Sequence, residues 1–157
     1  MVAIEWWSQP VETIHLPPNK TSFDVIVVGA GPAGCASASY LALSGAKVLL
    51  IEKDIFPRDK ICGDAVGGKS LSHLSKLGIK TQLESTPHFR VNSIIFGAPK
   101  GHTVKIPLPE KAVENLEAGY ALPRIQFDNI LFKKAVQLVQ NAGGYVIQGS
   151  RVKNILW

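Results

Sequence analysis

The apolar positions in the first third of the chain form two short runs separated by small residues. Residues 25–28 are β-branched, which predicts a strand buried on both faces of a parallel sheet. Residues 36–39 are small and predict a helix that ends at Ser44 and Gly45, and residues 47–51 predict a second strand. The order of strand, turn, helix and strand predicts a Rossmann-like α/β domain.

Hydrophobic spacing further along the chain predicts the remaining elements. Leu71, Leu74 and Leu77 share one helix face, and we expect Asp64 to cap this helix and Gly78 to end it. Residues 125–140 have the clearest amphipathic period. The other expected elements are a hairpin of strands 91–96 and 103–106, a polar connection over 107–119, and strands at 145–148 and 152–156.

The turn after the first strand carries the pattern G-x-G-x-x-G. Gly29 allows a tight turn, Gly31 lets phosphates approach the backbone, and Gly34 lets the helix pack closely. Pro32 suits the first helical turn, where its missing N–H costs nothing. Because the free N–H groups and the positive end of the helix dipole point into this turn, the sequence predicts a site for a dinucleotide's pyrophosphate.

Glu52 follows Gly34 by eighteen residues, close to where an acid that binds the adenosine ribose is expected. Its carboxylate can accept hydrogen bonds from both ribose hydroxyls and would repel a 2′-phosphate, which disfavours NADP at this site. FAD and NAD share the ADP half, so residues 29–52 fit either cofactor.

Composition excludes several other classes of protein. The net charge of +5 comes from 17 basic and 12 acidic residues without a basic stripe, so we expect no nucleic-acid partner. The two cysteines, Cys35 and Cys62, and the scattered histidines lack metal-ligand spacing, so we expect a reducing, cytoplasmic location and no metal site. No apolar run approaches the ~20 residues that span a bilayer.

We expect residues 1–22 to form an extension and residues 23–157 to form part of an FAD/NAD(P)-binding domain, with an inserted hairpin and connection at 87–121. The extension either packs across its own domain or places Trp6 and Trp7 at a membrane or partner surface.

Six segments of the chain carry a resemblance to a known family: FDVIVVGAGPAGCASA, KVLLIEK, FPRDKICGDAV, VNSIIFGAPKGHTVKIP, YALPRIQFDNILFKKA and GSRVKNI. They resemble the N-terminal part of the geranylgeranyl reductase family of FAD-dependent oxidoreductases, which is similar in fold to aromatic hydroxylases and tryptophan halogenases. The resemblance covers residues 23–155, and FPRDKICGD is its most family-specific segment.

The resemblance implies an FAD site. The residues that it implies are Gly29, Gly31, Pro32, Ala33 and Gly34 at the pyrophosphate, Glu52 at the ribose, Lys53 beside the adenosine, Arg58 and Lys60 at phosphate and ribityl oxygens, Cys62, Gly63 and Asp64 near the isoalloxazine, and Arg124 on the phosphate side. Simpler readings remain for some residues. Arg58 is otherwise a solvated loop charge, Cys62 a small buried residue, Cys35 a packing residue, Phe127 a core residue and Asp128 a carboxylate favoured by the helix dipole.

The resemblance also implies flavin-mediated reduction of isoprenoid C=C bonds with NAD(P)H as electron donor, and no catalytic residue is assigned. Two alternatives stay open: a flavin-dependent monooxygenase or halogenase of an aromatic substrate, and a non-catalytic FAD-binding fragment. Such proteins have a later Asp-Gly stretch followed by a Gly-Asp stretch, and neither is present here, because the pair Gly63–Asp64 belongs to the earlier loop. We therefore expect the 157-residue chain alone to be inactive and prone to form oligomers, with peripheral membrane association in the parent enzyme.

Overall fold

The computed structural model describes residues 22–62, 64–115 and 117–154, which form two compact units. The first unit combines the described residues up to Lys60 with those from Ile125 onward, and the second is Ile61–Arg124. The predictions for Trp6 and Trp7 lie outside the described residues. The expected insertion at 87–121 lies within the second unit.

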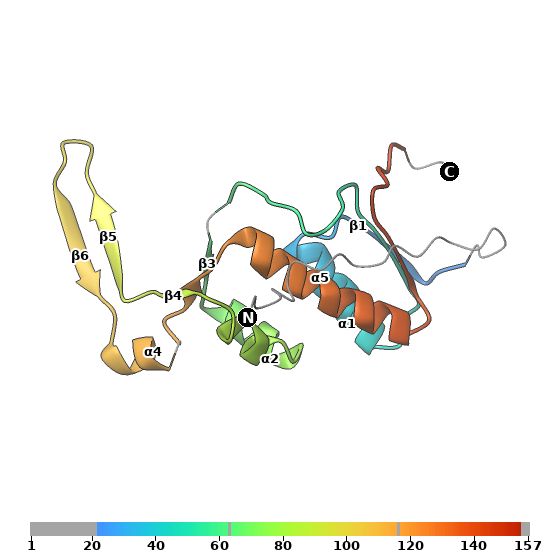
Figure 1. Ribbon diagram of the computed structural model, residues 1–157, viewed down its shortest axis with the longest axis horizontal. Helices are drawn as coiled ribbons and strands as arrows, with labels where there is room; N and C mark the ends of the chain where they lie inside the picture. The colour runs from blue at the N-terminus through green and yellow to red at the C-terminus, as the bar shows by residue number, and fades with distance from the viewer. Residues whose placement is uncertain (1–21, 63, 116, 155–157) are drawn as a thin grey trace, which may run out of the picture. The chain divides into compact units, whose positions relative to one another are not determined.

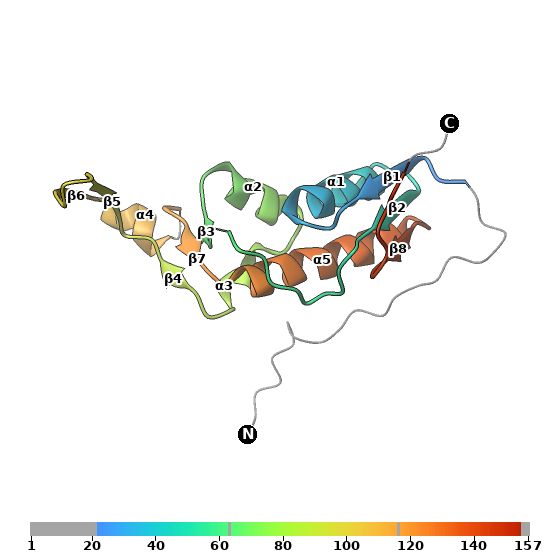
Figure 2. The ribbon, with the colours of Figure 1, turned by 90° about the horizontal axis from the view of Figure 1, so that it is seen from above.

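A parallel three-stranded sheet organises the first unit, in the order β1 (Val25–Val28), β2 (Val48–Ile51) and β8 (Tyr145–Ile147). Figure 1 labels β1 of this sheet, and Figure 2 labels all three strands. Helix α1 (Pro32–Leu43) connects β1 to β2, and helix α5 (Arg124–Asn141) precedes β8. Both connections advance through the sheet in the same direction, so their common handedness puts both helices on one side of it. Figure 2 shows α1 and α5 lying beside each other on that side.

Strand β1 has one open face, so the prediction that it is buried on both faces was wrong. Ile26 and Val28 are 58% and 62% exposed, whereas Val48, Leu49 and Leu50 of β2 are buried. In the described part of the chain β1 is an edge strand. Successive side chains of a strand point to opposite faces, and the two helices cover only one of them.

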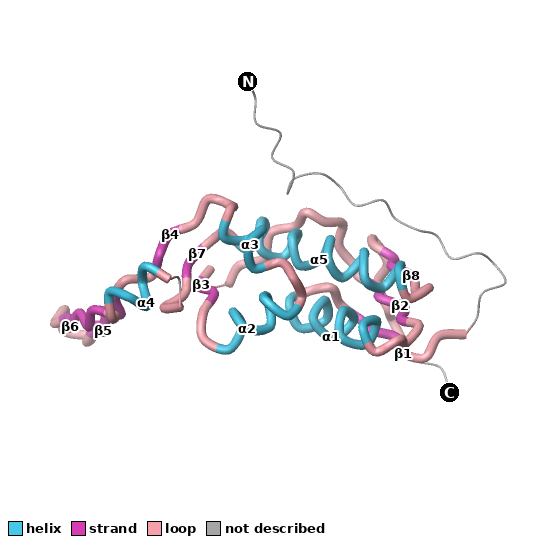
Figure 3. Tube along the Cα trace, turned by 90° about the horizontal axis from the view of Figure 1, so that it is seen from below, coloured by secondary structure: helices cyan, strands magenta, loops and turns pink. Residues whose placement is uncertain are grey.

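Helices α1 and α5, which are cyan in Figure 3, bury different kinds of residue. The buried residues of α1 are small, namely Cys35, Ala38, Ser39 and Ala42. Those of α5 include the large apolar side chains Ile130, Leu131, Phe132 and Val139, as its amphipathic period predicts. Small side chains on α1 let its backbone approach the sheet, while the buried apolar side chains of α5 are larger.

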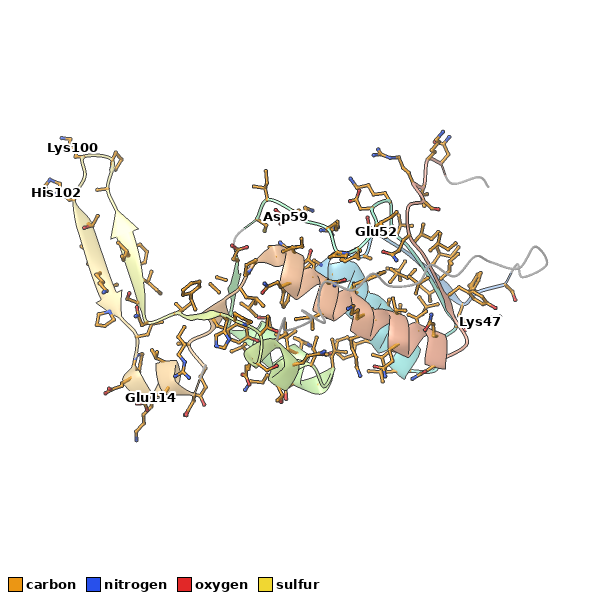
Figure 4. All side chains as sticks on the ribbon, viewed as in Figure 1. Lys47, Glu52, Asp59, Lys100, His102 and Glu114 are labelled. Carbon is orange, nitrogen blue, oxygen red and sulfur yellow. The ribbon has the colours of Figure 1, made fainter. Side chains whose placement is uncertain are left out.

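The second unit contains short elements. Strands β3 (Ala65–Val66), β7 (Tyr120–Ala121) and β4 (Phe89–Arg90) form an antiparallel sheet, β5 (Ser93–Gly97) and β6 (Thr103–Pro107) form the expected hairpin, and the helices are α2 (Lys69–Lys76), α3 (Lys80–Glu84) and α4 (Glu110–Glu114). Its buried apolar residues include Leu74, Leu77, Ile79, Leu83 and Tyr120. Figure 4 labels Lys100 and His102 at the end of the hairpin.

Two local predictions were wrong: the N-cap of α2 in the second unit, and the strand expected at 152–156. Gly68, not Asp64, is the N-cap of α2, and the Asp64 carbonyl instead accepts a hydrogen bond from the Leu122 N–H at 3.1 Å. The described residues of the strand expected at 152–156 have no strand pairing. Helices α3 and α4 were missed because elements of five residues show little periodicity.

Candidate cofactor-binding site

The glycine turn between β1 and α1 depends on two of its glycines for its backbone path. Gly29 has a φ of +98°, which L side chains rarely adopt, and its N–H donates to the Ile51 carbonyl at 2.7 Å. A Cβ on Gly34 would overlap the carbonyl oxygen of Gly29. The turn can therefore close against α1 only with glycine at position 34.

The first turn of α1 is open to an anion. Gly31 is the N-cap in extended conformation, no side chain caps the helix, and the first turn has no acidic residue. A Cβ built on Gly31 meets only Nη2 of Arg58, at 3.7 Å. The N–H groups at a helix start lack partners within the helix, and the dipole adds positive charge there. This end of α1 is therefore suited to a phosphate.

Glu52, labelled in Figure 4, directly follows β2, and its hydrogen bond with the Ala30 N–H directs the carboxylate into the turn. Its side chain is 4% exposed, Oε2 accepts a hydrogen bond from the Ala30 N–H at 2.5 Å, and Oε1 accepts one from the Asp54 N–H at 3.0 Å. Each carboxylate oxygen can accept a further hydrogen bond. Glu52 therefore fastens the glycine turn to β2, and its contact with a ribose stays a prediction.

A cavity of about 560 Å³ lies at the carboxyl ends of the parallel strands. Its lining consists of Val28, Gly29, Gly31, Ile51, Glu52, Lys53, Asp54, Arg58, Asp59, Lys60, Ser150, Arg151 and Val152. This volume is within the range of small-molecule sites, and open α/β sheets bind ligands at this edge. The side chains supply four cations beside three carboxylates.

The cavity brings together six of the predicted residues, namely Gly29, Gly31, Glu52, Lys53, Arg58 and Lys60. Sequence reasoning missed Ser150, Arg151 and Val152. They follow β8, and the Ser150 N–H donates to the Glu52 carbonyl at 2.9 Å. A signal was available, because the segment after any parallel strand of this sheet reaches the same edge.

The loop after β2 is anchored by the aromatic side chain of Phe56. This side chain is fully buried and stacks on Phe132 of α5, with ring centroids 4.2 Å apart. Its backbone N–H donates to the side-chain oxygen of Gln148 at 2.7 Å. Two residues on, the Arg58 guanidinium lies 4.8 Å from the centre of the Phe56 ring. The loop is therefore held against α5 while its charged residues line the cavity.

Arg58 forms an ion pair that the sequence did not predict. Its Nη1 lies 3.1 Å from Oδ2 of Asp128, and its Nε lies 3.7 Å from Oδ2 of Asp54. The side chains of Arg58 and Asp128 are 12% and 0% exposed. The reading of Arg58 as a solvated charge was wrong, and so was that of Asp128 as a carboxylate explained by the helix dipole.

The two cysteines differ in environment. Cys35 is buried, as expected, and its thiol donates to the Ala30 carbonyl at 3.0 Å. Burial first, and then the Asp128 carboxylate, raises the pKa of Cys35 well above its ordinary value, so the thiol stays neutral. Cys62 is exposed, which contradicts its reading as a small buried residue.

The remaining predicted residues do not line the cavity. Pro32, Ala33 and Gly34 form the first turn of α1 next to it. Cys62, Asp64 and Arg124 belong to the second unit, where Asp64 is exposed and Arg124 begins α5 as expected. Gly63 lies outside the described residues. The roles of these residues toward a cofactor stay predictions.

Comparison with known proteins decides between the two dinucleotides that the glycine turn allows. The family described as "FAD binding domain" matches residues 22–143. The chain belongs to this family. FAD is therefore the cofactor of this family, and the resemblance to FAD-dependent oxidoreductases is confirmed.

Two curated relatives and one solved structure illustrate the similarity. The chain is 32% identical over 137 residues to the menaquinone reductase of Mycolicibacterium smegmatis, covering 87% of this chain and 31% of the relative. It is 37% identical over 147 residues to the digeranylgeranylglycerophospholipid reductase of Methanocella arvoryzae, covering 87% and 34%. The myxobacterial chondrochloren halogenase shares the fold, with a TM-score of 0.71 at 24% identity over 86% of this chain and 30% of the halogenase. The chain therefore spans about a third of the length of these proteins.

Among the described helices of this chain, none has both the length and the apolar side chains that crossing a bilayer requires.

Proposed function

We propose that this chain forms the ADP-binding part of an FAD site in a flavoprotein that reduces C=C bonds of an isoprenoid chain with NAD(P)H as electron donor. The observation that carries the FAD site is the open first turn of α1 beside the buried Glu52 carboxylate. An uncapped helix start binds an anion, and a carboxylate accepts hydrogen bonds from hydroxyl groups. An ADP moiety offers both groups at neighbouring positions.

The residues around the cavity fit this cofactor. In this proposal Gly31, Pro32, Ala33 and Gly34 hold the pyrophosphate through the start of α1, and Glu52 binds the ribose. Lys53, Arg58 and Lys60 lie around the cavity and offset the phosphate charge. Bound flavin supplies the hydride-transfer chemistry, while these residues bind it and fix its orientation.

The reductase activity is supported by the two relatives, which are both named as reductases. One name includes digeranylgeranyl, which denotes an isoprenoid substituent. A lipid substrate would bring the complete enzyme to a membrane surface, so peripheral association belongs to the same proposal. The chondrochloren halogenase, at 24% identity, shows the fold alone. A flavin-dependent halogenase of Armillaria mellea is 30% identical to this chain over 142 residues, so the halogenase alternative is kept as the second candidate function.

The cofactor part of the proposal is tested by titrating the purified chain with FAD, ADP and riboflavin and following intrinsic and flavin fluorescence. We expect the chain to purify with little bound flavin, because it spans about a third of its relatives. Added FAD and ADP should compete for one site, and riboflavin should not bind. Riboflavin binding equal to that of FAD, without competition by ADP, would refute the assignment.

The reductase part is tested with the complete gene product, free flavin removed, under anaerobic conditions with NADH or NADPH. A geranylgeranyl phospholipid should gain one hydrogen molecule per reduced bond by mass spectrometry. A product that forms from an aromatic substrate only when oxygen is admitted would instead establish the monooxygenase or halogenase alternative.

A further inference from the structure

Asp128 is a buried carboxylate on α5, a helix whose other buried side chains are apolar except for Asn129. Its side chain is 0% exposed, and its Oδ2 lies 3.1 Å from Nη1 of Arg58, seventy residues away in the sequence. A carboxylate is almost never fully buried unless it is paired, because burial without a partner costs several kcal/mol. The position of Asp128 therefore depends on the guanidinium, and that of the guanidinium on Asp128.

The pair fixes which edge of the guanidinium faces the glycine turn. Nη1 is directed to Asp128, Nε lies near Asp54, and Nη2 is the nitrogen nearest to Gly31, 3.7 Å from where a Cβ would be. The Phe56 ring, 4.8 Å from the guanidinium carbon, constrains its plane as well. The N–H groups of Nη2 thus lie next to the start of α1, where the pyrophosphate is proposed to bind.

We propose that Asp128 is a positioning residue, which holds the Arg58 guanidinium so that Nη2 donates to the dinucleotide's diphosphate at Gly31. This inference rests on the proposed FAD site. An arginine side chain has several rotatable bonds, and ordering it upon binding would reduce affinity. Arg58 is ordered beforehand, and its planar fork can contact a carboxylate and a phosphate at the same time.

Asp54 provides a matched comparison on the same guanidinium. It carries the same charge, but its side chain is 43% exposed and 3.7 Å from Nε, a distance too long for a hydrogen bond. Exposed ion pairs contribute little because water screens them. If any carboxylate beside Arg58 were enough, removing Asp54 would also weaken binding measurably. If the hydrogen-bonded orientation of the guanidinium is relevant, only Asp128 should matter strongly.

The test measures the Kd for FAD and for ADP in the full chain and in four variants, Asp128→Asn, Asp54→Asn, Arg58→Gln and Arg58→Gln/Asp128→Asn. We expect Asp128→Asn to weaken binding about tenfold, the usual effect of one charged hydrogen bond, and Asp54→Asn to weaken it less than about threefold. In the Arg58→Gln background, Asp128→Asn should cause no further loss. Such non-additivity shows that Asp128 acts through Arg58, which a merely structural role would not produce.

Salt dependence and a second arginine variant complete the test. Arg58→Gln should reduce the increase of Kd with ionic strength, because it removes a cation from the diphosphate. Asp128→Asn keeps that cation, so it should lower the affinity while leaving the dependence of Kd on ionic strength close to that of the parent. If Asp128→Asn does not fold, Arg58→Lys decides, because an ammonium lacks the planar fork and should also weaken binding about tenfold.

Additive losses in the double variant, equal losses for Asp54→Asn and Asp128→Asn, or full affinity in Arg58→Lys would each overturn the inference. The variant Gly31→Val distinguishes failure of this inference about Asp128 from failure of the proposed FAD site. If Gly31→Val binds FAD as the parent does, the site itself is misassigned; if it loses FAD while Asp128→Asn keeps it, only the role of Asp128 is wrong.

Discussion

Gly31 and Gly34 belong to one motif, but the structure predicts opposite consequences of replacing them with alanine. At Gly34 a Cβ would overlap the carbonyl oxygen of Gly29, and the carbonyl carbon lies next to it. Both are backbone atoms of a turn whose N–H is hydrogen-bonded to β2. The overlap can be relieved only if α1 or the turn moves.

The expected size of the effect follows from two opposing contributions. Forcing extra volume into a packed site costs about 1–3 kcal/mol, and a backbone overlap should lie at the upper end. Alanine within a helix regains about 1 kcal/mol relative to glycine. Gly34→Ala should therefore lower the free energy of unfolding by about 2 kcal/mol, the difference between these estimates.

Gly31→Ala is the matched control. Gly31 has an ordinary φ of −66°, and its Cβ would make only van der Waals contact with Arg58. Stability should change by less than about 0.5 kcal/mol, as for unstrained exposed substitutions. FAD binding should nevertheless weaken, because the new methyl group occupies the side from which the phosphate approaches.

The assay is urea unfolding followed by circular dichroism, together with the FAD titration. For a slope of about 2 kcal/mol/M, Gly34→Ala should shift the midpoint by about 1 M. Unchanged midpoints for both variants would show that the turn yields without cost, and the packing argument would fail. A large stability loss in Gly31→Ala would contradict the assignment of that position to ligand approach.

Three further predictions concern single side chains. In the complete enzyme, Glu52→Ala should weaken FAD retention after desalting. It should also lower the free energy of unfolding by about 1.5–3 kcal/mol, because the Ala30 and Asp54 N–H groups lose a charged acceptor. Equal flavin content in the variant and the parent enzyme would remove Glu52 from the site. Burial, and then the charge of Glu84, raises the pKa of Tyr120 from 10.0 to about 12. Between about pH 10 and about pH 12 only the unfolded state releases the tyrosine proton, so the free energy of unfolding should fall as the pH rises through this range. Below pH 10 the contribution of this shift to stability is complete. Tyr120→Phe should abolish this slope and cost little at pH 7, because the hydroxyl has no hydrogen-bond partner among the described residues; an unchanged alkaline slope would point to another group. Cys62→Ser in the complete enzyme should keep flavin and most turnover because the thiol is exposed, whereas lost turnover with flavin bound would assign chemistry to the sulfur.

Local patterns in the sequence predicted the elements that build the cofactor site. The glycine spacing located the turn, the amphipathic period located α5 within one residue at each end, and the alternating apolar residues located the hairpin. These features are readable because each depends on neighbours a few residues apart: a turn requires a positive φ, and a helix face repeats every three or four positions. The acid after the second strand also follows from local spacing.

Tertiary structure alone decided how distant segments meet. The pairing of Arg58 with Asp128 joins residues seventy positions apart, and the stacking of Phe56 on Phe132 joins a loop to a helix. Neither contact has a sequence signal. The aspartate near the start of α5, for example, can be explained locally by the helix dipole without any partner. The open face of β1 was equally hidden, since a β-branched run specifies an extended backbone, whereas the number of covered faces depends on where the chain places its helices.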